Sequence, residues 1–599
     1  MATGIESLPL ISDGQSVEAI PGGPGYVPKT AQRPTPHRND ELASAVWERV
    51  KRARAAKVQL HDEWRKYWAF YQGDQWAGID RKGRSQLTVN FTFQLIEAQV
   101  PLVIGNKPHI YASPRTVDPE DGGFQQAADE INKYFEVLWD VEGIQSIMER
   151  LRREASIVGQ GWLKPIERLK WNSQYKAWEP TGIRIEQVSS FNVYPEPEAK
   201  SIDDCEYVAI CSRPSLRALN YHYGVPMEKA RRWVDSRSTT DREPDNLLSP
   251  TGLGSADQRV TVWEVWLDGG ERVVTLVEKS GEILRDIKNP FAHGQIPLCP
   301  IYNVETNGIF GMGDVQQLKP LQEEFNQIRS LIVDCGKLTA NPIIVIQNGN
   351  YTSQVANLPG AIVRVNDIQQ FRRESGVAMP GYVFQILRDI KEEMERIVGV
   401  PDIARGERPG RIVAMGAIQA LQTAANQRMS QKAGQVEEGL ARMGRQVVSL
   451  LRQYHSGGTS LSGVNPLEGR IETAAISPGT LVYDFDILVQ SGSTLPKNKG
   501  DLANMAMELF KITNGAIGIP VLLKALEFPY QREVIQNLQA QAAVGRQAPP
   551  ALGPPAGPPE GMPGAPGPPP QSAPATAGGN GEPGPVTPEM MMQLEAMMQ

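Results

Sequence analysis

Two long apolar stripes of helical period, separated by a short segment of different character, constrain the fold of this chain more than any other feature. The first stripe begins at Asp314, and its apolar residues recur at spacings of three and four, as on one face of an α-helix. They are Val315, Leu318, Leu321, Phe325, Ile328, Ile332, Cys335 and Leu338. At the usual rise per residue this helix is expected to be about 40 Å long. It should end at Asn341-Pro342, because proline cannot continue a helix.

The segment after this helix has the pattern of a small β insert. Two β-like runs, 343–347 and 361–365, are separated by turn residues that include Asn348-Gly349-Asn350 and Leu358-Pro359-Gly360. A second helix is predicted to follow and to end near Gly399, and it carries these residues on one face: Val383, Ile386, Leu387, Ile390, Met394 and Ile397. The pattern therefore predicts two long helices with a compact insert between them.

A third and longer helix is predicted after a charged loop, 399–413, that is rich in glycine and proline. Its apolar residues mostly alternate spacings of four and three, close to a heptad pattern. They are Ile418, Leu421, Ala425, Val436, Leu440, Met443, Val447, Leu450 and Tyr454. Such a helix is expected to pack along most of its length.

The first half of the chain differs from the second, because all 11 tryptophans lie between Trp47 and Trp266. Helices are predicted over Asn39–Tyr71, capped by Asn39 or Asp40, and over Ile131–Ile157. Aromatic and β-branched runs separated by turn residues predict strands within Gly161–Ile185, Phe191–Tyr194, Tyr207–Cys211 and Val260–Leu276. The fold class predicted from these patterns is α+β.

Both ends of the chain have the composition of disordered segments. Residues 1–38 mix Gly, Pro, Ser and Thr without periodicity, and Ala551–Pro588 contains 13 Pro and 9 Gly. Such segments bury too little apolar surface to offset the entropy of ordering. The Met-rich stretch Glu589–Gln599 can be interpreted as a short helix that binds a partner or as a frayed terminus.

Charge and hydropathy exclude several classes of protein. The chain has 61 basic and 68 acidic residues and a net charge of −7, which disfavours tight non-specific binding of DNA phosphates. It has no apolar run of about 18 residues and no secretory signal, so we expect no membrane span and no export. Four scattered cysteines, Cys205, Cys211, Cys299 and Cys335, predict no disulfide framework and fit a reducing compartment.

The residue types of common catalytic and cofactor sites are not found at the required spacings. Gly336-Lys337 is the nearest approach to a phosphate-binding loop, but Leu331 stands where the upstream glycine is needed. The histidines and cysteines have no zinc spacing, and there is no GxSxG motif. We therefore predict that the chain is not an enzyme, that it has no catalytic or metal-binding residue and that it needs no cofactor.

Two charged groups leave alternatives open. Asp484 and Asp486 alternate on a predicted strand and could hold Mg²⁺, or they could form a solvated face opposite Val482, Phe485 and Ile487. A basic cluster on the first helix could be a solvated face or a docking patch for an acidic protein or nucleic acid. Its members are Arg49, Lys51, Arg52, Arg54 and Lys57.

The order of several local strings resembles that of the portal proteins of tailed bacteriophages, over about residues 40–530. The strings are Phe70-Tyr-Gln-Gly-Asp-Gln-Trp76, Leu87-Thr-Val-Asn90, Gly105-Asn-Lys-Pro108, Phe191-Asn-Val-Tyr-Pro-Glu-Pro197, Ile202-Asp-Asp-Cys-Glu-Tyr207, Gly311-Met-Gly-Asp314, Leu358-Pro-Gly360 and Ile397-Val-Gly-Val-Pro401. Glu196 departs from the family pattern, which usually has Asp at that place.

The resemblance implies a portal-like ring subunit and a name for each part of the chain. The parts are a disordered arm (1–38), a mixed α/β wing (39–313 and 414–495), two stem helices (314–340 and 381–398), a β-containing clip (341–380), a tunnel loop (399–413), helical crown (496–546) and a disordered Pro/Gly-rich tail (547–599). Tunnel-loop residues that would face the DNA channel are Arg405, Gly406, Glu407, Arg408, Gly410 and Arg411. Residues expected to pack the stem are Leu321, Phe325, Ile328, Ile386, Ile390 and Met394.

The resemblance also implies partners and a location. A portal is a ring of twelve copies at one capsid vertex of the virion, assembled in the host cytoplasm, through which double-stranded DNA passes without sequence-specific binding. Its protein partners would be the terminase large subunit, the major capsid protein and a head-completion or tail adaptor protein. The alternatives are a nuclease or ATP-driven translocase, and another virion ring or scaffold protein without a channel.

Overall fold

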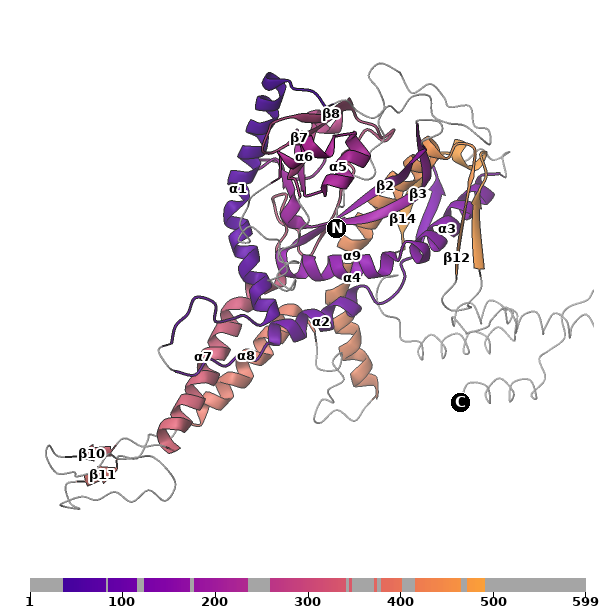
Figure 1. The fold of residues 1–599 in the computed structure, drawn as a ribbon. Helices are drawn as coiled ribbons and strands as arrows, with labels where there is room; N and C mark the ends of the chain where they lie inside the picture. The colour runs from indigo at the N-terminus through magenta and orange to yellow at the C-terminus, as the bar shows by residue number, and fades with distance from the viewer. Residues whose placement is uncertain are drawn as a thin grey trace, which may run out of the picture. The chain divides into compact units, whose positions relative to one another are not determined.

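The structure is a computed structural model that describes ten segments of the chain. They are 36–81, 84–115, 123–172, 177–234, 259–340, 344–346, 371–373, 379–400, 415–464 and 471–490. All of them belong to one of the two compact units of the chain, the unit that comprises Met1–Val464 and Ile471–Pro496. Helices and strands both contribute extensively to this unit, as Figure 1 shows, so the predicted α+β class is confirmed.

The first helix, α1 (Asp40–Gln72), forms where the sequence predicts it. The Asn39 side chain caps its N-terminus by accepting a hydrogen bond from the Leu42 amide at 3.1 Å. Its C-terminus ends at Gly73, whose φ of 93° is a left-handed conformation that glycine adopts without strain. Val46 and Val50 are fully buried against the neighbouring sheet.

That sheet has five antiparallel strands in chain order, from β4 to β8. They are β4 (Val193–Pro195), β5 (Val208–Ser212), β6 (Val262–Leu267), β7 (Arg272–Val277) and β8 (Ile283–Lys288). Side chains alternate across the sheet, so Trp263 and Val265 face α1 whereas Trp266 and Val273 join the main core. Two short helices, α5 (Leu216–Tyr223) and α6 (Met227–Arg231), contribute to a separate small cluster together with residues of β6, β7 and β8.

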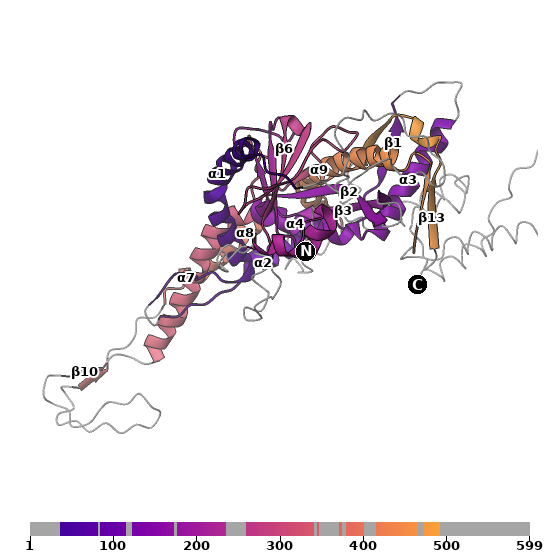
Figure 2. The same ribbon diagram turned by 45° about the horizontal axis from the view of Figure 1, so that its top comes forward.

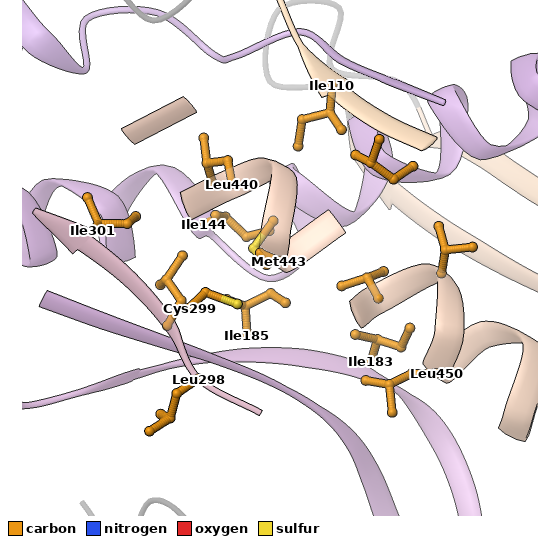
Figure 3. Close-up of a cluster of buried hydrophobic side chains, with 14 of the residues drawn as sticks. Ile110, Ile144, Ile183, Ile185, Leu298, Cys299, Ile301, Leu440, Met443 and Leu450 are labelled. Carbon is orange, nitrogen blue, oxygen red and sulfur yellow. The ribbon is translucent and has the colours of Figure 1, made fainter. Parts of the chain in front are cut away.

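The main core forms around the long helix α9 (Met415–Tyr454). This helix packs against a three-stranded sheet of order β3-β2-β9, made of β2 (Gln160–Asn172), β3 (Ala177–Val188) and β9 (Cys299–Tyr302). Figure 3 shows Leu440, Met443 and Leu450 of α9 among core side chains of these strands. The predicted packing of the third helix is therefore confirmed within its described side chains, and it joins the second half of the chain to the first.

Further pairings close this core. The strand β1 (Ile110–Pro114) pairs with β14 (Phe485–Val489), so that Ile110 lies opposite Val489. The hairpin of β12 (Thr459–Val464) and β13 (Ile471–Ile476) packs on α3 (Gly123–Val141). Helix α4 (Ile144–Val158) and short 3-10 turns, including Ser190–Asn192, Asp268–Gly270 and Thr480–Val482, complete this part of the fold.

Two sequence predictions need correction, and one helix is absent from the predicted elements. The single helix expected over Ile131–Ile157 is two helices, α3 and α4, separated at Gly143, which has a φ of +60°. Helix α2 (Phe91–Val103) was not predicted, because it is apolar on most sides and contains Pro101. Val482 does not face the Phe485 side of a strand, because it lies before β14 and is 83% exposed.

The two helices predicted around the insert are α7 (Asp314–Ala340) and α8 (Tyr382–Val398), and both are confirmed. They lie side by side and run in opposite directions (Figures 1 and 2). Between them, β10 (Ile344–Ile346) pairs with β11 (Phe371–Arg373) in antiparallel register. The first β-like run thus contains a strand, whereas the run 361–365 lies outside the described residues.

The predicted terminal segments are largely outside the described residues. The exception is the end of the N-terminal arm, where His37 and Ile283 exchange two backbone hydrogen bonds of 3.1 Å at the edge of β8. The described part of the chain therefore begins slightly earlier than the predicted boundary at residue 39. The crown (496–546), the tail (547–599) and the Met-rich end are not described.

Candidate stem and channel site

The six residues predicted to pack the two helices come together in one apolar cluster. Phe325, Ile390 and Met394 are buried, and Leu321, Ile328 and Ile386 are partly buried against them. The cluster also contains Leu95, Leu318, Leu387, Val398 and Val400. The matching apolar stripes of α7 and α8 thus bury each other, as the spacing of each stripe requires.

Helix α2 forms the third side of this cluster near its base. The Phe91 ring meets the Phe325 ring edge-on, with the centroids 5.0 Å apart. Lys391 Nζ of α8 lies 5.9 Å from the centroid of the same Phe91 ring. One aromatic residue of α2 therefore contacts both α7 and α8.

A second face of α7 binds the segment that leads into α2, residues 84–90, which we call the strap. Polar residues at every fourth position of α7 hydrogen-bond to every second residue of the strap and of the α2 start. The donor–acceptor pairs are Ser85 N to Asp334 Oδ1 at 2.9 Å, Leu87 N to Ser330 Oγ at 3.0 Å, Val89 N to Asn326 Oδ1 at 3.3 Å and Phe91 N to Gln322 Oε1 at 3.0 Å.

These four hydrogen bonds form a series that we call the ladder, each bond being one rung. The periods of α7 and of the extended strap explain it. Four helical residues rise about 6 Å and two extended residues about 6.6 Å, so the two repeats stay in step over four rungs. The two rungs nearest α2 are buried, with Gln322 fully inaccessible and Asn326 2% exposed. Gln322 Nε2 also donates to the Val89 carbonyl at 2.8 Å, so that the backbone of the strap is satisfied by side chains of α7.

The two rungs nearest α2, formed by Gln322 and Asn326, are expected to hold the strap in place. Replacing Gln322 and Asn326 together by Leu leaves the amides of Val89 and Thr92 without their side-chain acceptors, at a cost of about 3 kcal/mol. Hydrogen exchange followed by mass spectrometry should show faster exchange over 84–92 in this variant. The control is Gln327→Leu, an exposed position of the same helix. Unchanged protection of the strap in the double variant would contradict the assigned role of the ladder.

The base of α7 is fixed to α9 by a buried ion pair. Both carboxylate oxygens of Asp314 accept hydrogen bonds from Lys432 Nζ at 2.8 Å, and Oδ1 also accepts from Asn303 Nδ2 at 3.2 Å. The side chains of Asp314 and Lys432 are 8% and 12% exposed. Burial lowers the pKa of Lys432, and the Asp314 carboxylate opposes this shift.

Arg152 of α4 extends the same polar network. Its guanidinium is fully buried and donates to Asn303 Oδ1 at 2.5 Å and to Gln99 Oε1 of α2 at 3.3 Å. Burial lowers the pKa of Arg152 to about 10, against the attraction of Asp314. The network joins α2, α4, α7 and α9 at the point where α7 begins.

Glycines allow the backbone that leads into α7 to lie very close to the backbone at the end of α4. Gly311 and Gly313 pass directly against the backbone at the end of α4, where Gly159 has a φ of +109°. A Cβ on Gly159 would lie 2.5 Å from the Gly311 carbonyl carbon, and one on Gly313 would lie 2.8 Å from the Ile157 carbonyl carbon. Only glycine therefore fits this contact, which includes the Gly311–Asp314 string singled out from the sequence.

The alternatives left open for charged residues are decided by their partners. Asp484 pairs with Arg115 at 3.5 Å and with Arg452 at 3.3 Å, and Asp486 lies 3.9 Å from Arg445. No group of His, Cys, Asp or Glu suited to a metal ion occurs among the residues that the structure describes. The two aspartates are thus partly exposed and form ion pairs with arginines, as the interpretation of a solvated face expects.

The five residues of the basic cluster of α1 do not all lie at the surface. Lys57 is 1% exposed and donates to the carbonyls of Ser190 and Val193, while burial lowers its pKa. Three other members of the cluster form ion pairs: Lys51 with Glu48, Arg52 with Glu198 and Arg54 with Glu278. For Lys57 the prediction of a solvated face was wrong, because the surrounding aromatic rings and carbonyls bury its ammonium group.

The cysteines of this part of the chain are free thiols. Cys299 is fully buried in the main core, and burial raises its pKa to about 12. Burial also raises the pKa of Cys205 to about 12. Both thiols are therefore protonated at neutral pH, which fits a structural role in packing.

The tunnel-loop residues predicted to face a channel, Arg405 to Arg411, lie outside the described residues. The helix that follows them, α9, carries Lys432 and so connects that loop to the base of α7. Among the described helices, none combines the length and the apolar character needed to cross a bilayer.

Sequence reasoning missed the strap, its ladder and the buried network at the base of α7. One signal for the ladder was present, since Gln322, Asn326, Ser330 and Asp334 form a polar stripe of period four beside the apolar stripe. A polar stripe usually faces solvent, so the spacing alone did not indicate a partner.

Residues 119–517, which include α7, α8 and α9, match the family described as phage SU10 portal protein. The match covers more than half of the 599 residues, and the chain belongs to this family of portal proteins. No curated protein matches the chain. Membership confirms the resemblance to tailed-phage portals: these are ring-forming structural components of the virion capsid, and the family is not an enzymatic one.

Proposed function

We propose that copies of this chain form a twelve-membered ring around a channel at one capsid vertex, through which DNA is packaged and later ejected. Helices α7 and α8 are the stem, residues 341–380 the clip and residues 399–413 the tunnel loop. The wing comprises 39–313 and 414–495, and the crown 496–546. The ring is assembled in the host cytoplasm and binds the major capsid protein, the terminase large subunit and a head-completion or tail adaptor protein.

The observation that carries this proposal is the antiparallel helix pair that flanks residues 341–381 and is anchored at its base. The pair shares one apolar cluster with α2, and α7 is tied to α9 through Asp314 and Lys432. Such a rod can transmit force or movement between an insert at one end and the long helix at the other. The segment Asp314–Val398 has 9 Lys and Arg against 10 Asp and Glu, a net of −1. A wall without excess positive charge lets a polyanion slide rather than bind.

The test uses a charge placed in the stem. Ile390, 4% exposed, is replaced by Asp, which buries an unpaired carboxylate in the α7–α8 cluster. We expect the wild-type chain to form rings in native mass spectrometry and this variant to form none. We also expect DNA-filled particles to disappear in a complementation assay. Gln385→Asp, at an exposed position of the same helix, is the matched control.

A second variant separates channel function from folding. Gly406 and Gly410 are replaced by Pro, which should restrict the tunnel loop while leaving rings intact. We expect a lower DNA content of the particles with this variant. A wild-type chain that forms no ring, or particles with wild-type DNA content in both variants, would contradict the proposed function.

A further inference from the structure

Helices α7 and α8 each carry an exposed glutamate and an exposed arginine that are five residues apart. They are Glu324 and Arg329 on α7, and Arg388 and Glu393 on α8. Five residues turn a helix through about 140°, so on each helix the two charges lie on nearly opposite sides. None of the four has an ion-pair partner in the part of the chain that the structure describes.

Contacts with α2 show which charges share a side. Lys391 of α8 and Phe325 of α7 both lie against Phe91, which defines the α2 side of the helix pair. Arg388 is one turn before Lys391, and Arg329 is one turn after Phe325, so both arginines lie on the α2 side. Because the helices are antiparallel, both also lie about 5 Å beyond the Phe91 contact, at one level of the rod. We call this surface the arginine face.

The two glutamates share the opposite side of the pair, which we call the glutamate face. Glu324 adjoins Phe325 in sequence and Glu393 is two residues from Lys391, so both lie within about 3 Å of the level of the Phe91 contact. Each face also has exposed apolar residues one or two turns from its charges. Phe384 accompanies the arginines, while Leu331 and Ile397 accompany the glutamates, and all three are 46% exposed.

Two opposite faces with opposite charges, about 7.5 Å apart along the rod, suit a staggered head-to-tail contact between copies. A cyclic ring requires such a contact, because one surface of each subunit must bind a different surface of the next. We propose that the arginine face of one copy binds the glutamate face of the next copy in the stem of the ring. This inference rests on the proposed ring and identifies the surfaces that would close it.

The test reverses the charge of one face at a time. Glu324→Arg with Glu393→Arg makes both faces positive, and Arg329→Glu with Arg388→Glu makes both negative. Each double variant alone should lose rings in native mass spectrometry, because like charges then meet at every contact, weakening each by about tenfold or more. Mixed in equal amounts, the two variants should recover rings in which they alternate. A chain with all four reversals should also form rings.

The control carries the same change of charge elsewhere. Asp129→Arg with Glu136→Arg reverses two exposed acids on one face of α3 and should keep rings. Wild-type rings that persist in both stem double variants, or that are not recovered in their mixture, would overturn the interface while leaving the proposed ring in place. A wild-type chain that stays monomeric would overturn the proposed function and the interface with it.

Discussion

Replacing Gly159 by alanine is expected to prevent recovery of the folded protein. The substitution adds two costs at one position. The residue would have to hold a φ of +109°, where a Cβ is strained, and its Cβ would lie 2.5 Å from the carbonyl carbon of Gly311. The backbone of Gly311 and Met312 cannot move away without disturbing the start of α7, because it is main chain rather than the end of a flexible side chain. The combined loss of stability should be about 4 kcal/mol or more.

Two further substitutions separate these costs. Gly143→Ala meets a left-handed φ of +60° with no atom within 4 Å, so it measures the backbone strain alone, about 1 kcal/mol. Gly313→Ala has no left-handed φ but meets the Ile157 carbonyl, so it measures the steric overlap alone. Thermal unfolding should give the Gly143 variant a higher melting temperature than the Gly313 variant, whereas Gly159→Ala should yield no folded protein to melt. A Gly159→Ala protein with the melting temperature of the wild type would show that the contact between α4 and the entry to α7 is not required.

Replacing Lys432 by methionine is expected to destabilise the base of α7 by about 3–5 kcal/mol. The change removes the donor of two hydrogen bonds and leaves the Asp314 carboxylate buried without its cation. The junction between α7 and α9 should loosen first, which hydrogen exchange over 314–322 and 428–436 would report. Lys319→Met is the matched control, because its partner Glu323 is 39% exposed.

The same ion pair permits a more discriminating measurement. Lys432→Met leaves the Asp314 carboxylate buried without Lys432, and Asp314→Asn removes that uncompensated charge. Asp314→Asn combined with Lys432→Met should therefore be more stable than Lys432→Met alone. Thermal unfolding of the two single variants and the double variant gives the coupling energy directly. Additive effects of the two substitutions would show that the residues do not act as a pair.

Much of the fold could be predicted because amphipathic patterns are local. The apolar stripes of α1, α7, α8 and the described part of α9 occur within a few turns of each helix, so the sequence alone located them. Helix α2 was missed because a helix that is apolar on most sides has little periodicity. The division of α3 from α4 was also missed, because a single glycine ends a helix only where its backbone adopts the left-handed conformation.

The packing between α7 and α8 was the most predictable part of the candidate site. Each helix had one apolar face and no other predicted partner, and the six residues expected to pack do share one cluster. Asp314, Lys432 and Arg152 were not recognised as a network. They belong to three helices that are far apart in the chain, and charged residues are ordinarily exposed.

By itself, the sequence determined the class of fold, the extents of the long helices and the faces that they bury, because each depends on the period of neighbouring residues. It also indicated the family, through short strings in a shared order. Only the tertiary structure decided that the polar stripe of α7 binds the strap, that Lys432 meets Asp314, and that Gly159 touches Gly311. These contacts join residues more than a hundred positions apart. A side chain with several possible partners binds the one that the packed core places within hydrogen-bond distance.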